Sequence, residues 1–413
     1  MEYPKLRQVE ALAAQDNLIC LRDLQGFSNK LLFVPQDIFF ICTLFDGKHS
    51  IIDIQAEYTR KFGNLLFSDK VREIIDKLDG ALFMESNRFS EAKNTAIKDF
   101  KNSPIRPASH SGTAYESKTD SLVKQIEGLF SSPDGPGLPD LQKSPSGRLR
   151  ALIAPHIDLR RGGACFAWSY AELARECGAK TFVILGISHT ETHRRFVLTA
   201  KDFKTPLGNL PADRDFIAKI SENCRYDFFT DEFAHRNEHS IEFQVLFLQY
   251  LFRSRSDIKI VPILCSSFHQ LIYSGDSPEN DDEIKSFINA LETAVREYGS
   301  EVCCIAGVDL SHVGRRFGQN LSISPAFIKQ MEAEDNKMLK PVLDRDAEDF
   351  FQLIQEEKDR RNICGVPAIY TLLKLLGPLK PLNSGSSKLL KYDQAVDYNT
   401  QSIVSFAGAA FYE

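Results

Sequence analysis

The stretch that decides the fold is TFVILGISH, residues 181–189, in which seven strand-forming residues lead directly into Ser188 and His189. Runs of the same kind are RLRALIA at 148–154, IKIVPIL at 258–264 and VCCIAGV at 302–308. Short apolar runs of this kind are typical of strands buried on both faces, as in parallel sheets. Helical patterns separate the runs. The sequence therefore predicts an α/β domain with three layers, α/β/α, around a mostly parallel sheet.

Three of these runs end beside a histidine. His156 follows the first run, His189 follows the second, and Asp309 and His312 follow the run at 302–308. In open α/β sheets, ligands collect beyond the carboxyl ends of the strands. A single loop histidine is more often just hydrogen-bonded, but repetition at equivalent positions favours a convergent site. Two imidazoles from strand ends are suitable first ligands for a metal ion.

The spacing leaves the third ligand open. A carboxylate could come from Asp158, Asp309 or Glu242, and a thiolate from Cys364. Cys364 stands just before an apolar helix expected at 367–376, where the positive end of the helix dipole favours the thiolate. That position favours a ligand or a nucleophile over an inert core residue.

The segment EHSIE, residues 238–242, opens a strongly apolar helix. His239 and Glu242 are three residues apart, so they share one helical face and can point into the same space. The segment is not the HExxH motif of metalloproteases, which needs histidines four residues apart. An equally good interpretation is a polar first turn that complements the helix dipole.

The chain divides into a small domain at 1–90, a polar linker at 91–103 and a large domain at 104–413. In the small domain the patterns predict a strand at 30–34, helices at 35–45, 51–62 and 68–78, and an edge strand at 81–84. This order suggests a small α+β winged-helix-like domain.

Short motifs in the small domain resemble PqqD-like peptide-chaperone domains. They are FDG at 45–47, IIDI at 51–54 and LDG at 78–80. No helix carries a stripe of lysine and arginine, so a peptide or protein contact is expected here rather than DNA binding. A capping domain without a ligand of its own is the alternative.

Composition narrows the function classes. The net charge of −6 provides no basic field for nucleic acid. No apolar run approaches 18 residues, and the N-terminus has no basic region followed by an apolar stretch, so neither a membrane span nor export is expected. Nine cysteines occur without CxxC pairs, which argues against a disulfide framework or a zinc ribbon and favours a cytoplasmic location.

A set of motifs between residues 104 and 413 resembles the Memo family, in the family's order. The motifs are RPASHSGTAY at 106–115, APH at 154–156, ILGISH at 184–189, EHSIE at 238–242, DLSH at 309–312 with Arg316 and Phe317, ICG at 363–365 and the closing run QSIVSFAGAA at 401–410. Jointly they are far more specific than any one of them.

The resemblance implies a fold similar to class III extradiol dioxygenases, which hold ferrous iron with two histidines and a glutamate. It implies metal ligands at His156, His189 and Cys364, with Asp309, His312 and His239 lining the pocket. Since the third ligand is then sulfur, dioxygenase activity is not carried over with the fold. A Memo domain behind an N-terminal extension also resembles the B component of the AmmeMemoRadiSam system, which implies a radical-SAM protein and an AMMECR-type protein as partners.

The chain departs from the family pattern around the pocket. Residues 157–159 are Ile-Asp-Leu where the family usually has Ala-Gly-aromatic, Ile187 replaces a proline, and Val313 replaces a tryptophan. After the Cys-Gly pair, residues 366–368 read Val-Pro-Ala in place of Arg-x-Pro. The implied ligands remain but the pocket walls differ, so a substrate cannot be inferred from the family.

Our working hypothesis from sequence is a non-haem metal protein with redox or oxygen-related chemistry. Iron(II) is the first choice, with copper or zinc as alternatives. His312 would act as acid or base, oriented by Asp309, and His239 would position substrate or oxygen. The rival hypotheses are a non-catalytic scaffold whose pocket holds a peptide or partner, and a hydrolase that uses Cys364 with His156 or His312 as a nucleophile pair.

Overall fold

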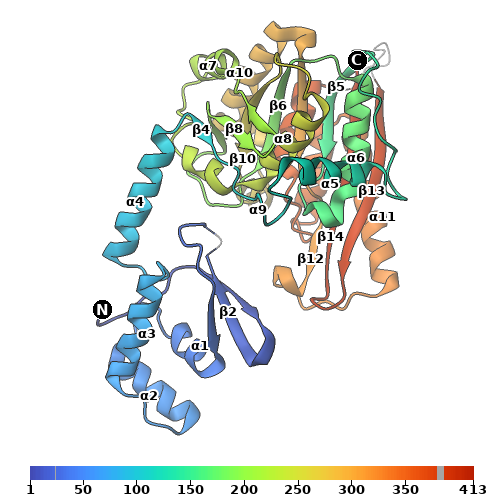
Figure 1. The fold of residues 1–413 in the computed structure, drawn as a ribbon. Coiled ribbons are helices and arrows are strands. Elements are labelled where there is room, and N and C mark those ends of the chain that lie inside the picture. The colour runs from blue at the N-terminus through green and yellow to red at the C-terminus, as the bar shows by residue number, and fades with distance from the viewer. Residues whose placement is uncertain (24, 379–385) are drawn as a thin grey trace. The chain divides into compact units, whose positions relative to one another are not determined.

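The computed structural model describes residues 1–23, 25–378 and 386–413. The chain forms two compact units, Met1–Asn102 (unit 1) and Ser103–Glu413 (unit 2), both drawn in Figure 1. All nine cysteines are free. Among the described residues, no helix combines the length and apolar character needed to cross a lipid bilayer.

Unit 1 begins with a three-stranded antiparallel sheet and continues as helices. The sheet has the order β1 (Glu10–Ala13), β2 (Leu18–Arg22), β3 (Leu32–Pro35), and the helices are α1 (Gln36–Thr43), α2 (Ile51–Phe62), α3 (Ser68–Gly80) and α4 (Asn87–Asn102). Helix α2 starts with a capping box between Ser50 and Asp53 and ends at Gly63, whose φ of 73° is the left-handed conformation that glycine adopts readily. Its local signals therefore define both ends.

The helices predicted at 35–45, 51–62 and 68–78 are observed as α1, α2 and α3, and the strand predicted at 30–34 is observed as β3. The edge strand predicted at 81–84 was wrong. Leu82 has a φ of 62°, so the chain turns after α3, and Met84 makes only an isolated bridge to Leu6. Helix α4 follows and includes most of the predicted linker. The terminal edge strand that completed the winged-helix-like order is therefore not observed in residues 81–102.

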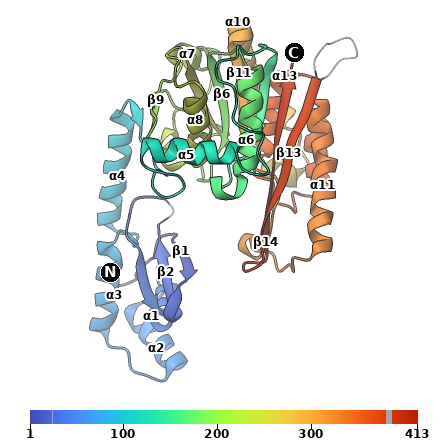
Figure 2. The same ribbon diagram turned by 45° about the vertical axis from the view of Figure 1, so that its right-hand side comes forward.

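Unit 2 is built on an eight-stranded mixed sheet with the order β12-β14-β5-β11-β6-β10-β7, and β13 pairs with β14. The strands are β5 (Leu149–Ala154), β6 (Thr181–Ile187), β7 (Phe196–Leu198), β10 (Lys259–Cys265), β11 (Val302–Gly307), β12 (His312–Gly314), β13 (Ser386–Asp397) and β14 (Ser402–Tyr412). The four central strands, β5, β11, β6 and β10, are parallel, as predicted. The strands outside them pair antiparallel, and β13 and β14 form the long hairpin that is red in Figure 2.

Helices cover both faces of this sheet because its strands are apolar on both sides. Phe182 and Ile184 pack toward α5 (Thr119–Phe130), α6 (Leu159–Glu176) and α8 (His239–Leu251). Val183 and Leu185 pack toward α7 (Arg214–Glu222), α10 (Asp282–Tyr298), α12 (Ala347–Glu356) and α13 (Val366–Leu376). The arrangement confirms the mixed α/β class with a helical layer on each face.

The remaining strands and α-helices of unit 2 lie around this core. They are β4 (Ile105–Arg106), β8 (Asp202–Thr205) and β9 (Gly208–Leu210), which form a small sheet, and the helices α9 (His269–Ser274) and α11 (Pro325–Asp344). Through β4, the first residues of unit 2 pair with β8. That pairing places the 106–115 motif beside the start of α8.

Candidate metal centre

The carboxyl ends of three neighbouring parallel strands place the predicted residues at one edge of the sheet. His156 follows β5, His189 follows β6, and residues 309–312 follow β11, which lies between those two strands. Sequence reasoning predicted this convergence because parallel strands end on the same side.

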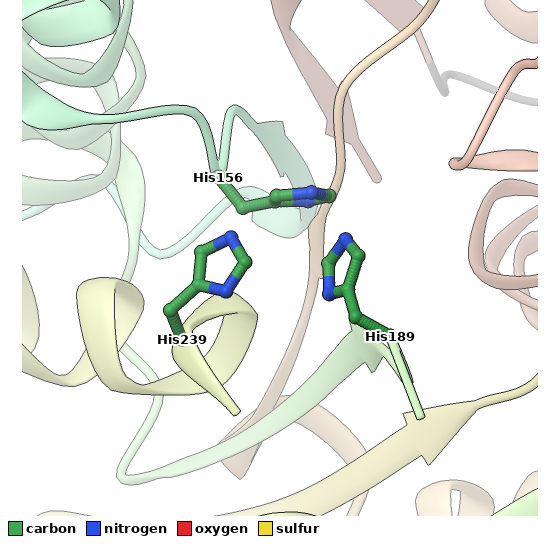
Figure 3. A group of neighbouring side chains, drawn as sticks. All are labelled: His156, His189 and His239. Atoms are coloured by element: carbon green, nitrogen blue, oxygen red, sulfur yellow. The ribbon is translucent and has the colours of Figure 1, made fainter. Parts of the chain in front are cut away.

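Three histidines form the centre of the site. One ring nitrogen from each of His156, His189 and His239 lies within 4.8 Å of the other two, and the ring centroids are 4.8 to 5.2 Å apart. His239 enters from the first turn of α8, whereas His156 and His189 enter from loops after strands, as Figure 3 shows. Donor atoms this close to one another could hold a metal ion.

Each of the three rings has a partner at Nδ1. In His156, Nδ1 lies 3.0 Å from the carbonyl oxygen of Gly307. In His189, Nδ1 lies 3.0 Å from Oε2 of Glu238, and in His239 it lies 3.2 Å from Oε1 of the same carboxylate. A ring that donates from Nδ1 keeps Nε2 as its lone-pair donor, so the three Nε2 atoms are the available metal-binding atoms.

Cys364 lies beside this cluster rather than inside it. Its Sγ is 3.8 Å from Nε2 of His156 and 3.5 Å from the carbonyl oxygen of Asp309, but the group of mutually close donors among the described residues is the three histidines. Burial raises the pKa of the Cys364 thiol well above its usual value. The thiolate expected from the helix dipole is therefore disfavoured in the protein without a metal, because desolvation outweighs the dipole.

Asp309 is buried at the wall of the site. One carboxylate oxygen accepts hydrogen bonds from the backbone N–H groups of His156 at 3.0 Å and Ile157 at 3.2 Å, and the other lies 3.9 Å from Nε2 of His156. Burial raises the pKa of Asp309 to about 6. The carboxylate thus fixes the loop that carries His156.

His312 is oriented differently from the sequence prediction. Its Nδ1 lies 3.1 Å from the carbonyl oxygen of Leu310, and its ring contacts that of Phe317 edge-on. The prediction that Asp309 orients it was wrong, because the Asp309 carboxylate is engaged with the backbone of residues 156 and 157. Burial lowers the pKa of His312 to about 4, so the ring is neutral at pH 7 and is only a weak base.

The two other carboxylates considered as third ligands have structural roles. Asp158 caps α6 and accepts from the backbone N–H of Arg160 at 2.8 Å. Glu242 is fully buried, forms an ion pair with Arg106, and accepts hydrogen bonds from the Tyr115 hydroxyl and from backbone N–H groups of the 106–115 motif. Neither belongs to the histidine cluster.

Arg106 is the residue of the 106–115 motif that holds the start of α8. Its buried guanidinium donates to the carbonyl oxygens of His235 at 3.0 Å and Glu238 at 2.6 Å, in addition to the Glu242 carboxylate. One arginine therefore holds both the approach to α8 and its first turn. Sequence reasoning quoted the motif but assigned it no role.

A second group missed by sequence reasoning holds residues 358–364, the segment that ends at Cys364. The backbone carbonyl oxygen of Arg361 accepts from His312 N–H at 2.7 Å, and the Asn362 side chain donates to the His312 carbonyl oxygen at 3.0 Å. The buried Arg361 guanidinium pairs with Asp335, which also accepts from Ser311. His312 and Asn362 are 50 residues apart, and Asp335 and Arg361 are 26 apart, so the sequence gave no signal of these contacts.

The chain is similar in sequence to known proteins. The sequence pattern of the family described as "Memo-like protein" matches residues 106–410. The chain belongs to the Memo family. A MEMO1 family protein of Aquifex aeolicus is 30% identical over 409 residues, 99% of this chain and all of the relative. A MEMO1 family protein of Methanobrevibacter smithii is 29% identical over 315 residues, 74% of this chain and 99% of the relative. A Memo family relative can thus match nearly the whole chain or only about three-quarters of it.

Proposed function

We propose that unit 2 is a metal-dependent redox protein whose ion is held at His156 and His189. The observation that carries the proposal is the convergence of three imidazoles, each with its Nδ1 already occupied. Iron(II) is the first choice, and copper or zinc are the alternatives, because imidazole suits all three metals.

Buried charge around the cluster supports a bound cation. Glu238 and Asp309 are 5% and 2% exposed, and in the described part of the chain no lysine or arginine side chain bonds to either carboxylate. Buried carboxylates without a matching cation are costly. A divalent ion on the histidines would offset both charges.

Two residues compete for the third ligand position. The geometry favours His239, whose ring belongs to the cluster, while the family resemblance implies Cys364, whose Sγ is 3.8 Å from His156. A thiolate would favour a softer metal than three imidazoles would. The third ligand therefore decides which metal the site prefers.

The site is accessible to a substrate, since the side chains of His189 and His239 are 42% and 29% exposed. Bound iron or copper would supply electron-transfer or oxygen chemistry there. His312 would accept a hydrogen bond from a substrate group that reaches it and act there as a weak base, because burial lowers its pKa to about 4 and keeps the ring neutral. The raised pKa of Cys364 argues against the hydrolase hypothesis.

Unit 1 has features that suit a protein contact. Ile52, Leu65 and Phe67 are each more than 70% exposed, and apolar side chains that form a contiguous exposed patch often mark interaction surfaces. We extend the proposal to a peptide or protein partner at unit 1, with the radical-SAM and AMMECR-type proteins as candidates from the family resemblance. Co-purification of these proteins with the full chain, and its loss in an Ile52→Asp, Phe67→Asp variant, would test this extension.

Metal content tests the main proposal. The full chain is purified anaerobically and its metals are measured by elemental analysis, beside a His156→Ala, His189→Ala variant and a His193→Ala control. His193 is exposed and bonds to Asp231 outside the cluster. We expect about one metal ion per chain in the wild type and the control, and none in the double variant.

Two outcomes would contradict the proposal. One is a wild-type chain that neither retains a metal nor takes one up under anaerobic conditions, which would leave the scaffold hypothesis. The other is a double variant that binds metal as the wild type does.

A further inference from the structure

Glu238 is the residue before α8, and its one carboxylate contacts both histidines on that side of the cluster. Oε2 accepts from the backbone N–H of His189 at 3.0 Å and lies 3.0 Å from its Nδ1. Oε1 accepts from the backbone N–H groups of His239 at 2.8 Å and Ser240 at 2.9 Å, and lies 3.2 Å from Nδ1 of His239. The two oxygens thus divide between a loop after β6 and the first turn of α8.

The charge of this carboxylate is not matched by a basic side chain. Among the residues that the structure describes, no lysine or arginine bonds to it, and Arg106 reaches only the backbone carbonyl oxygen of Glu238. The side chain is 4% exposed. Its partners are therefore backbone N–H groups and the two imidazoles, and helix capping alone would not need the second oxygen on His189.

We infer that Glu238 is a positioning residue that holds His189, a proposed metal ligand, beside His239, a candidate for the third ligand. By accepting from Nδ1 of His189, and with Oε1 3.2 Å from Nδ1 of His239, it favours the tautomer in which Nε2 of each ring is free to bind the ion, and it fixes the distance between a strand-end loop and a helix terminus. This inference rests on the proposed function for its consequence, metal affinity, but the tautomers can be measured without a metal.

Glu238→Gln separates positioning from capping. The remaining amide oxygen can still accept from His239 and Ser240 N–H, whereas the amide nitrogen cannot accept from His189. In the metal-free full chain, ¹⁵N NMR of the imidazoles should show Nδ1–H tautomers for His189 and His239, and the variant should lose this preference at His189. Cobalt(II) affinity, measured by visible absorption in competition with a chelator, should fall about 10- to 100-fold.

Asp213→Asn is the matched control. Asp213 precedes α7 as Glu238 precedes α8, is also buried, and accepts from the backbone N–H of Phe216 at 3.3 Å, but it lies outside the histidine cluster. The substitution should leave the tautomers and cobalt affinity nearly unchanged. Glu238→Asp, which keeps both oxygens and the charge on a shorter side chain, should recover part of the affinity and serves as the second variant if Glu238→Gln does not fold.

The outcomes separate this inference from the proposed function. A wild-type chain that binds no cobalt(II) contradicts the proposed function, and the tautomers then decide the role of Glu238. Cobalt binding and tautomers that are the same in wild type and Glu238→Gln overturn the inference and leave the metal proposal standing.

Discussion

The start of α8 and residues 358–364 each bring a candidate third ligand to His156 and His189, but they are held in different ways. The start of α8 has regular backbone, and buried charges fix it: Arg106, Glu238 and Glu242. Residues 358–364 carry positive φ angles at Lys358, Asp359 and Asn362, and hydrogen bonds to the His312 backbone hold them. His239 is therefore positioned by buried charges, whereas Cys364 is positioned by a strained backbone segment that hydrogen bonds to neighbouring residues hold in place.

Removal of Arg106 from the buried ion pair with Glu242 should cause the largest effect, a loss of stability. Arg106→Ala leaves the buried Glu242 carboxylate without its cation and the carbonyl oxygens of His235 and Glu238 without their donor, so we expect unit 2 to lose about 3–5 kcal/mol of unfolding free energy. Urea unfolding followed by the fluorescence of Trp168, the single tryptophan, reports on unit 2. Arg214→Ala, which breaks an exposed pair with Asp202, should cost less than about 1 kcal/mol. Equal losses in both variants would refute the role given to Arg106.

The affinity for a metal ion distinguishes His239 from Cys364 as the third ligand. If the geometry selects His239, His239→Ala should weaken cobalt(II) binding by roughly a hundredfold to a thousandfold, while Cys364→Ser should change it less than about tenfold. A sulfur ligand would reverse the order, and the sulfur-to-metal charge-transfer band of the cobalt protein would disappear in Cys364→Ser. Equal and small effects from both substitutions would contradict a third protein ligand at either position.

The pH dependence tests the burial of His312, which residues 358–364 fix. Its pKa in the folded chain is lowered to about 4 by burial, so below the unfolded value of about 6.5 the unfolded chain binds the extra proton. Stability from this residue is complete above pH 6.5 and declines as pH falls toward 4, by about 2–3 kcal/mol. The loss between pH 6.5 and 4 should be smaller in His312→Gln, whereas an unchanged profile would show that His312 is not buried as described.

Substitution of Asn362, whose backbone is strained, should cause the smallest change in stability. Its φ of 49° suits glycine, and its side chain donates to the His312 carbonyl oxygen. Asn362→Gly loses the hydrogen bond but accommodates the angle, whereas Asn362→Ala loses both, so Asn362→Ala should be less stable by about 1 kcal/mol. Thermal unfolding of the pair measures the difference. The same melting temperature in both variants would indicate that the angle stores no strain.

The sequence predicted the parts of this comparison that depend on strand order. His156, His189, Asp309 and His312 were found because apolar runs mark buried strands and parallel strands end at one edge. Most of the sheet and three helices of unit 1 were predicted for similar local reasons. Whether the metal is held by His156, His189 and Cys364 remains a prediction.

The features that the sequence did not predict depend on contacts between residues that are far apart along the chain. The acidic residue before α8 has the pattern of an ordinary cap, and its second oxygen on His189, 49 positions away, leaves no local trace. Arg106 and Glu242 are 136 residues apart. The strand predicted at 81–84 failed because apolar residues also pack in turns, as Leu82 does at positive φ. Burial likewise reversed the expected pKa direction of Cys364.

The bonds made by Arg106 also set where the chain can be shortened. Unit 2 begins at Ser103, only three positions before the arginine that holds the start of α8. Proteolysis or recombination that separates the units ahead of Ser103 would leave His239 and Glu238 in place. A cut a few residues later would release Arg106 and with it the helix terminus, although every histidine of the cluster would still be present.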